Sequence, residues 1–103
     1  TEEGRLAAQV AKEHHERWDG SGFPLGLRGE GISLEGRLLA VANVVDAFLA
    51  SEEGRAGDGR EALRRHLEAL SGRELDPALV ALALAELDAL LALREAARAG
   101  AAA

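Results

Sequence analysis

The sequence predicts an all-α fold, a helical bundle of about four helices. Of its 103 residues, 48% are hydrophobic, and most of these are alanine and leucine, which favour helices. Aromatic residues are few (Trp18, Phe23 and Phe48), which disfavours an all-β fold. Apolar side chains recur at intervals of three and four residues, the helical spacing. A chain of this length suits one domain.

Composition narrows the classes of partner. The net charge of −6 argues against nucleic acid or an anionic membrane as the main partner. The chain has no cysteine, which excludes disulfides and thiolate metal sites. No apolar run is long enough to span a bilayer and nothing resembles a signal peptide, so the cytoplasm is the expected compartment.

The first helix is expected from about Glu2 to Trp18. One of its sides carries Leu6, Val10, His14 and Trp18. The turn-forming run 19–22 ends this pattern, and the glycine-rich segment 19–33 is predicted to be a loop. Its apolar residues indicate that the loop packs against the body of the domain; they are Phe23, Leu25, Leu27 and Ile32.

The second helix is expected from Leu34 to about Ala50, with Ser33 as its N-cap. It is apolar on most faces, which is typical of a central, buried helix. Asn43 and Asp46 interrupt it, and their spacing allows them to share a face.

The third and fourth helices follow a polar loop at 51–59. Asp58 and Glu61 form a predicted capping box for a helix that ends near Leu70. Asp76 and Pro77 then predict the start of a helix that continues to about Arg98. Residues 1–98 are thus expected to form the domain, and 99–103 a frayed tail. The last helix is too rich in leucine to be covered by so short a chain, so we expect another copy or a further part of the protein to cover it.

A pair of histidines is the first candidate for chemistry. His14 and His15 precede Glu16, and imidazoles are ligands for Fe, Mn, Zn and Ni. Side chains adjacent on a helix point about 100° apart, so the pair suits two ions better than one. The alternative is that His14 lies at the edge of the core and His15 in solvent. The third histidine, His66, lies on a charged helix face, and we expect it to be solvated.

Other candidates each have a structural alternative. The backbone of the loop from Asp19 to Pro24 is suited to a phosphate, although most such stretches are only turns. Phe23 is suited either to stack on a base or to pack on the core. Asn43 and Asp46 need polar partners, either another helix or, for Asp46, an imidazole that it would orient. Arg55 is either a phosphate ligand or a surface charge.

Taken in order, these motifs resemble a known family. The run from His14 to Pro24, HHERWDGSGFP, resembles the second signature of the HD-GYP proteins, and the resemblance extends over about residues 12–80. Those proteins hydrolyse cyclic di-GMP at a site with two or three metals in a helical domain. The resemblance implies a divalent metal such as Fe or Mn, with His14 and His15 as ligands. It also implies a nucleotide site formed by Asp19, Gly20, Gly22, Phe23, Pro24 and Arg55.

Three departures from the family pattern leave two hypotheses. The family's His-Asp dyad lies upstream of this motif and is not found here, so the chain resembles the C-terminal half of the domain. Asn43 replaces an aspartate that binds metal in the family, and Glu52 falls where an arginine is expected. One hypothesis is part of a phosphodiesterase for a cyclic dinucleotide, partnered by the missing N-terminal half or by a second copy. The other is a sensor or interaction module without catalysis or metal.

Overall fold

A computed structural model describes residues 1–56 and 59–102, with side chains to Gly100. Within that part every regular element is helical, which confirms the all-α fold, although the helices exceed the four expected. They are α1 (Glu2–Glu13), the short 3-10 helix η1 (Gly29–Gly31), α2 (Leu34–Ala50), α3 (Glu52–Arg55), α4 (Gly59–Leu70), α5 (Pro77–Ala85) and α6 (Leu87–Ala102).

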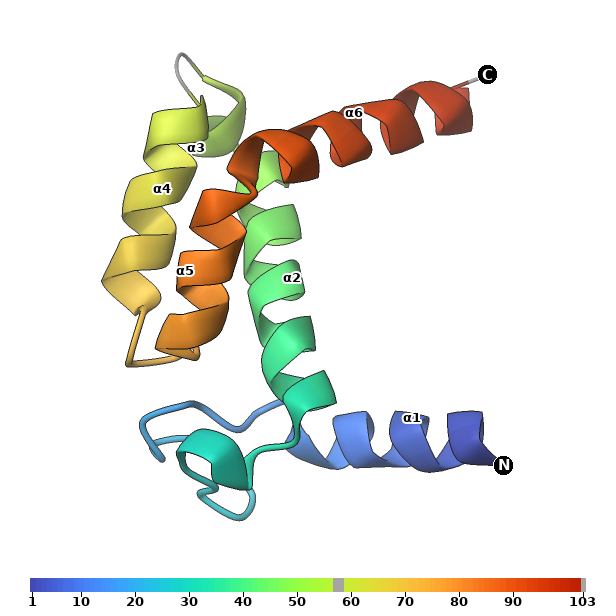
Figure 1. Cartoon of the computed structure of the whole chain (residues 1–103), viewed down its shortest axis with the longest axis vertical. Helices are drawn as coiled ribbons and strands as arrows, with labels where there is room; N and C mark the ends of the chain where they lie inside the picture. The colour runs from blue at the N-terminus through green and yellow to red at the C-terminus, as the bar shows by residue number, and fades with distance from the viewer. Residues whose placement is uncertain (57–58, 103) are drawn as a thin grey trace.

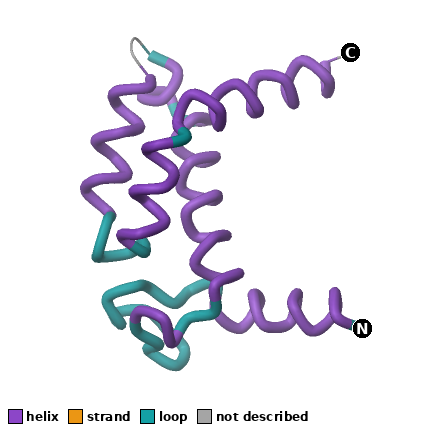
Figure 2. The backbone as a smooth tube through the Cα atoms, viewed as in Figure 1, coloured by secondary structure: helices purple, strands orange, loops and turns teal. Residues whose placement is uncertain are grey.

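Helix α2 forms the spine of the molecule (Figure 1). Helices α4 and α5 pack on one side of it. From its two ends α1 and α6 project in the same direction, so the molecule is open on that side. The long loop between α1 and α2 folds up beneath the N-terminal end of α2 (Figure 2). This loop contains most of the residues that the sequence nominated for chemistry.

The core lies where α2, α4 and α5 meet. Its buried side chains come from these three helices, the turn before α5 and the first residue of α6. They are Val41, Phe48, Leu63, Leu67, Leu75, Val80, Ala83 and Leu87. Leu63 and Leu67 are four residues apart on α4, and Val80 and Ala83 are three apart on α5, so each pair shares one helical face.

Two predicted helix starts are confirmed by their capping geometry. The Ser33 hydroxyl accepts a hydrogen bond from the Gly36 backbone N–H at 3.1 Å. The Asp76 carboxylate accepts one from the Ala78 N–H at 2.9 Å, and Pro77 is the first residue of α5. Both caps satisfy backbone donors that have no partner within the helix. The Asp58 cap proposed for α4 lies outside the described residues.

The predicted end of the first helix was wrong: α1 stops at Glu13 instead of near Trp18. The backbone after it forms long-range hydrogen bonds in place of helical ones. The His15 carbonyl accepts from the Phe23 N–H at 3.1 Å, and the Asp19 N–H donates to the Arg73 carbonyl at 2.8 Å. Each backbone group bonds only a few partners, so these contacts compete with continuation of the helix.

Two further boundaries differ from the prediction. The polar loop after α2 contains the short helix α3, for which the Ser51 hydroxyl caps the Gly54 N–H at 3.1 Å. The expected fourth helix is divided at Glu86 into α5 and α6. Leu87, next to this break, is only 1% exposed, so burial of its side chain accompanies the change of direction. Helix α6 includes residues 99–102, and whether that end frays stays a prediction.

The open side of the molecule exposes apolar surface. Contrary to expectation, α2 is not buried on most faces, since Leu38 and Leu39 are exposed. On α5 and α6, Leu82 is 58% and Leu93 is 68% exposed, so the expected uncovered face exists. A groove of about 450 Å³ lies between α2, α5 and α6. Among the described residues, no helix combines the length and apolarity needed to cross a membrane.

Candidate functional site

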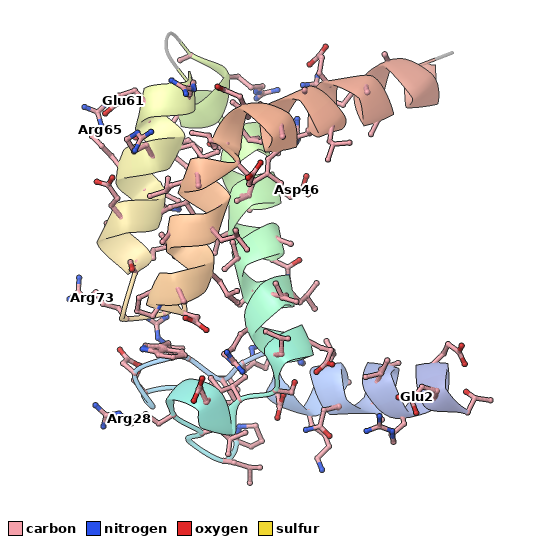
Figure 3. The ribbon with its side chains drawn as sticks, in the orientation of Figure 1. Glu2, Arg28, Asp46, Glu61, Arg65 and Arg73 are labelled. Carbon is pink, nitrogen blue, oxygen red and sulfur yellow. The ribbon has the colours of Figure 1, made fainter. Side chains whose placement is uncertain are left out.

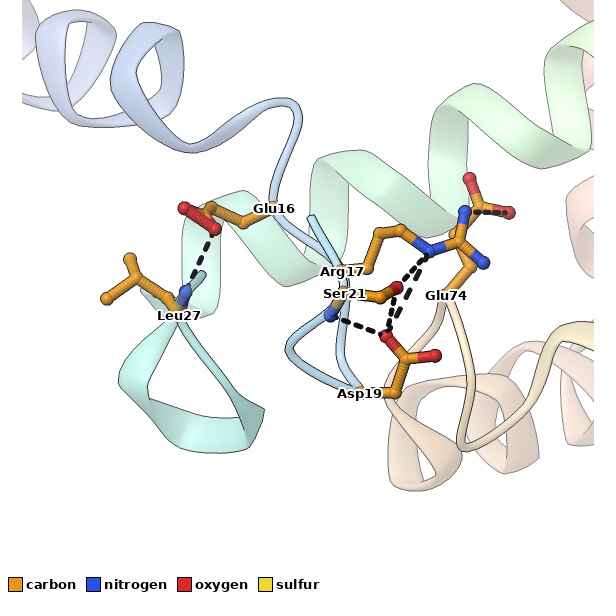
Figure 4. Close-up of polar contacts among 6 residues, drawn as sticks. All are labelled: Glu16, Arg17, Asp19, Ser21, Leu27 and Glu74. Carbon is orange, nitrogen blue, oxygen red and sulfur yellow. Dashed lines mark hydrogen bonds and ion pairs between the residues drawn. The ribbon is translucent and has the colours of Figure 1, made fainter. Parts of the chain in front are cut away.

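Two buried carboxylates anchor the loop between α1 and α2. Glu16 is 7% exposed, and its two oxygens accept hydrogen bonds from the N–H groups of Leu25 at 2.8 Å and Leu27 at 2.9 Å. Figure 4 shows the bond to Leu27. A carboxylate that accepts two backbone bonds satisfies donors that the loop itself leaves unpaired. Glu16 therefore determines the path of the loop beyond Pro24.

Glu13 fixes the other end of the same loop. Its carboxylate accepts hydrogen bonds from the backbone N–H and the hydroxyl of Ser33 and from the Gln9 amide, the last at 2.9 Å. Burial alone raises the pKa of Glu13, but the hydrogen bonds from Ser33 and Gln9 outweigh it, and the net pKa lies below its ordinary value. Ser33 thus caps α2 and binds the end of α1 at once.

The first turn of the loop depends on a glycine. A Cβ on Gly22 would collide with the His15 carbonyl oxygen and lie 2.6 Å from the Arg17 nitrogen. Only glycine permits this approach of backbone to backbone. The sequence assigned Gly20 and Gly22 to a phosphate-binding loop; the structure shows that Gly22 also has a packing role.

Asp19 organises this turn through polar contacts (Figure 4). Its carboxylate accepts hydrogen bonds from the Ser21 hydroxyl at 2.6 Å and the Ser21 N–H at 2.9 Å. These bonds, the hydroxyl's first, lower the pKa of Asp19. Arg17 donates to Ser21 at 3.0 Å and pairs with Glu74 at 3.8 Å. The loop is thereby attached to the turn before α5.

Three exposed rings lie in series beside the turn. The His14 and His15 ring centroids are 4.0 Å apart, and the His15 ring stacks on Phe23 at 4.6 Å. Phe23 is 59% exposed, so packing on the core was the wrong alternative for this residue. The two histidines follow the end of α1, so the 100° relation expected on a helix does not apply to them.

The protonation of His14 follows from its partner. Its Nδ1 lies 2.7 Å from the Ala11 carbonyl oxygen. A carbonyl only accepts, so Nδ1 carries a proton, and in the neutral imidazole Nε2 is then the nitrogen with the free lone pair. A neutral imidazole held in this tautomer by a backbone carbonyl is the usual state of a histidine that binds metal.

His14 and Asn43 line one cavity between α1 and α2. This cavity has a volume of about 580 Å³, its other polar residue is Glu35, and its apolar residues are Leu6, Ala7, Val10, Ala11 and Leu39. The structure thus brings Asn43 to the same cavity as His14. Within the described residues, however, no three His, Cys, Asp or Glu side chains gather in a group able to hold a metal ion. The residues present therefore fit part of a metal site and do not complete one.

Asp46 and Arg55 lie elsewhere. Asp46 lines the apolar groove on the open side (Figure 3) and is 3.4 Å from Arg94, so it does not share a cavity with Asn43. Arg55 ends α3, which follows the C-terminal end of α2, whereas the histidines lie near its N-terminal end (Figure 1). The predicted site residues therefore fall into separate groups.

Sequence reasoning missed some features and misplaced one residue. The anchoring roles of Glu13, Glu16 and Ser33 were not foreseen, although a glycine-rich loop with many unpaired N–H groups next to two glutamates was a usable signal. His66 was expected to be solvated, but it is half-buried and its ring stacks on Phe48 at 4.7 Å.

Comparison with known proteins shows which family and which characterised proteins this chain resembles. The model of a family described as "HD domain" matches residues 4–79. A 3′3′-cGAMP-specific phosphodiesterase 2 of Vibrio cholerae is 40% identical over 90 residues, which are 87% of this chain and 17% of that protein. The cyclic di-GMP phosphodiesterase response regulator RpfG of Xanthomonas campestris is 45% identical over 76 residues, 74% of this chain and 20% of that protein.

A third relative comes from a different bacterium. The cyclic di-GMP phosphodiesterase of Thermotoga maritima is 40% identical over 76 residues, or 74% of this chain. It is also much longer, since those residues are 21% of its length. The chain thus spans about a fifth of each of these three relatives.

Proposed function

Because this chain belongs to the HD-domain family, as its resemblance to HD-GYP proteins implied, we propose that it forms part of a metal-dependent phosphodiesterase for a cyclic dinucleotide. The names of the similar proteins, which are cyclic di-GMP and 3′3′-cGAMP phosphodiesterases, support this class of substrate. The proposal includes a role in bacterial signal transduction within the cytoplasm.

The state of His14 is the observation that carries the proposal. Its Nδ1 faces the Ala11 carbonyl, which leaves Nε2 as the nitrogen able to bind a metal, and His14 lines the same cavity as Asn43. We propose His14 and His15 as imidazole ligands of a divalent metal such as Fe or Mn. When bound, such a metal would supply an activated water and stabilise the leaving oxygen of a phosphodiester.

The adjoining loop is proposed to hold the nucleotide. The turn is fixed by Asp19, Gly20 and Gly22. Phe23 presents an exposed ring beside it, and Pro24 follows. Phe23 and His15 are already stacked, and such a pair offers a flat surface on which a base can stack. The anchoring by Glu16 means that the turn is organised before a ligand arrives.

A second candidate function is a sensor or interaction module without catalysis. Asn43 favours it, since a neutral amide binds a divalent ion more weakly than a carboxylate does. Glu52 favours it as well, because it stands where the family pattern has an arginine. In this case the scaffold and the stacked rings would serve binding only.

Hydrolysis and metal binding test the proposal separately. We expect the 103-residue chain alone not to hydrolyse cyclic di-GMP with Mn²⁺ or Fe²⁺, because the described residues provide too few ligands for a two-metal centre. Chromatography of the reaction would check this. Linear dinucleotide or GMP above the level of a His14→Ala, His15→Ala control would contradict it.

Metal binding is tested by restoring a carboxylate. Asn43→Asp should increase the Mn²⁺-dependent rise in melting temperature, and His14→Ala should abolish it. Asn43 is exposed, so the new charge should cost little stability without metal. An equal response to Mn²⁺ in Asn43→Asp and the parent chain would remove Asn43 from the site. No response in either protein would favour the module without metal.

A further inference from the structure

A second group of charged side chains lies near the C-terminal end of α2. A cavity of about 400 Å³ lies between α3 and α6, remote from the histidines. Its lining residues are Leu49, Gly54, Arg55, Leu91, Arg94, Glu95 and Arg98. It shares no residue with the cavity that contains His14. Three of its lining residues are arginines, in a chain whose net charge is −6.

The arginines reach this cavity from two helices. Arg55 is the last residue of α3, while Arg94 and Arg98 are four residues apart on α6 and so occupy one face of it. Two like charges at this spacing repel each other, and an anion between them relieves that repulsion. In the described part of the chain, neither the Arg55 nor the Arg98 side chain forms an ion pair.

Arg94 is held in place by its surroundings. Its side chain is 26% exposed, and Asp46 lies 3.4 Å from its Nε. That Nε is shielded from solvent and donates no hydrogen bond within the described residues. Asp46, whose side chain is 78% exposed, forms an ion pair with Arg94 without accepting a hydrogen bond from its Nε. The charges left in the cavity are Arg55 and Arg98 against Glu95, a local positive excess.

The residues that line this cavity favour a ligand with a phosphate group. Guanidinium groups present planar pairs of donors that match the oxygens of a phosphate. Leu49 and Leu91 add half-buried apolar surface to the same cavity. We propose that the cavity between α3 and α6 binds the phosphate group of a small molecule through Arg55 and Arg98, with Arg94 lining the same cavity. This site is independent of the histidines, so Arg55 belongs to it and not to the loop after α1.

Titration calorimetry of the 103-residue chain with pyrophosphate tests this site. We expect saturable binding that weakens about tenfold in Arg55→Gln and in Arg98→Gln, the size of effect expected for loss of a charge-assisted hydrogen bond. Arg65→Gln is the matched control. Arg65 is exposed on the outer side of α4 (Figure 3), and its replacement by glutamine changes the net charge by the same amount. It should bind pyrophosphate like the parent chain.

Parallel titrations with inorganic phosphate and GMP distinguish the sources of the phosphate. Equal affinity for both would mean that only the phosphate is recognised. Tighter binding of GMP that is lost in Arg98→Gln would mean that Leu49 and Leu91 also contact the nucleoside. Either result supports the site. The proposal is wrong if no probe binds at millimolar concentration, or if Arg65→Gln weakens binding as much as Arg98→Gln does.

Amide chemical shifts supply a readout that does not depend on the variants. Pyrophosphate should shift the amide signals of Gly54 and Arg98 and leave those of His14 and Gly22 unchanged. Shifts confined to His14 and Gly22 would overturn the proposal, because they would place the phosphate at the loop after α1. Arg98→Lys, which keeps the charge but loses the paired donors, should bind more tightly than Arg98→Gln.

Discussion

The two ends of α2 contrast in how their polar groups are partnered. At the N-terminal end, Glu13 and Glu16 are buried and every one of their oxygens accepts a hydrogen bond. At the C-terminal end, Arg94 has a shielded nitrogen that forms no hydrogen bond within the described residues, and the groove that it lines exposes Leu82 of α5. The first end is organised by this chain alone, whereas the second leaves a donor and an apolar surface for something else to cover. Four measurements test this contrast.

The largest effect is expected at the organised end, from Gly22→Ala. The new methyl would meet the backbone of His15 and Arg17, which cannot move without distorting the loop. We expect a loss of about 3 kcal/mol in the free energy of unfolding, at the upper end of the usual cost of overpacking. Urea denaturation measures it. Gly31→Ala in the same loop, where nothing lies within 4 Å of a new methyl, should change little, and equal losses would contradict the packing role of Gly22.

A smaller loss is expected for Glu16→Gln. The amide that replaces one carboxylate oxygen would face a backbone N–H of Leu25 or Leu27, donor against donor. We expect about 2 kcal/mol of destabilisation, with faster hydrogen exchange at those two amides. Glu30→Gln, an exposed change in the same loop, is the control. Unchanged exchange at Leu25 and Leu27 would mean that the loop does not depend on Glu16.

The exposed leucines on the open side of the molecule should cause the chain to self-associate. We propose that a second copy covers the exposed leucines, and we expect concentration-dependent dimers in analytical ultracentrifugation. Leu82→Gln should weaken dimerisation about tenfold, and Leu25→Gln, which changes an exposed leucine of the loop, should not. A monomer at every concentration would reject the dimer, and aggregation instead of dimers would favour a further part of the protein as the partner.

The smallest effect concerns acid stability. The pKa of Glu13 is lower in the folded chain than in the unfolded one, so its ionised form stabilises the fold above about pH 4.5. That contribution is lost as the pH falls below this value and through the lower folded pKa. The unfolding free energy of Glu13→Gln should therefore fall less steeply over this range than that of the parent chain. Parallel curves for the two proteins would show that Glu13 does not titrate with folding.

The sequence predicted the features that are encoded locally. Ser33 and Asp76 cap their helices through bonds to N–H groups two or three residues away, so the local sequence alone specifies these starts. The spacing of apolar residues indicated the all-α class in the same way. The run from His14 to Pro24 also carried the family, because its motif is continuous in the sequence.

Contacts between distant parts of the chain determine where α1 ends, where α5 gives way to α6, and which candidate residues share a cavity. The loop backbone finds partners as distant as Arg73, and the break at Glu86 accompanies the burial of Leu87, neither of which local propensity contains. Asn43 joins His14, as the resemblance implied, whereas Arg55 joins Arg98, because α3 follows the far end of α2, a helix about 25 Å long. Such groupings depend on contacts between residues far apart in the chain, and these contacts exist only once the helices have packed.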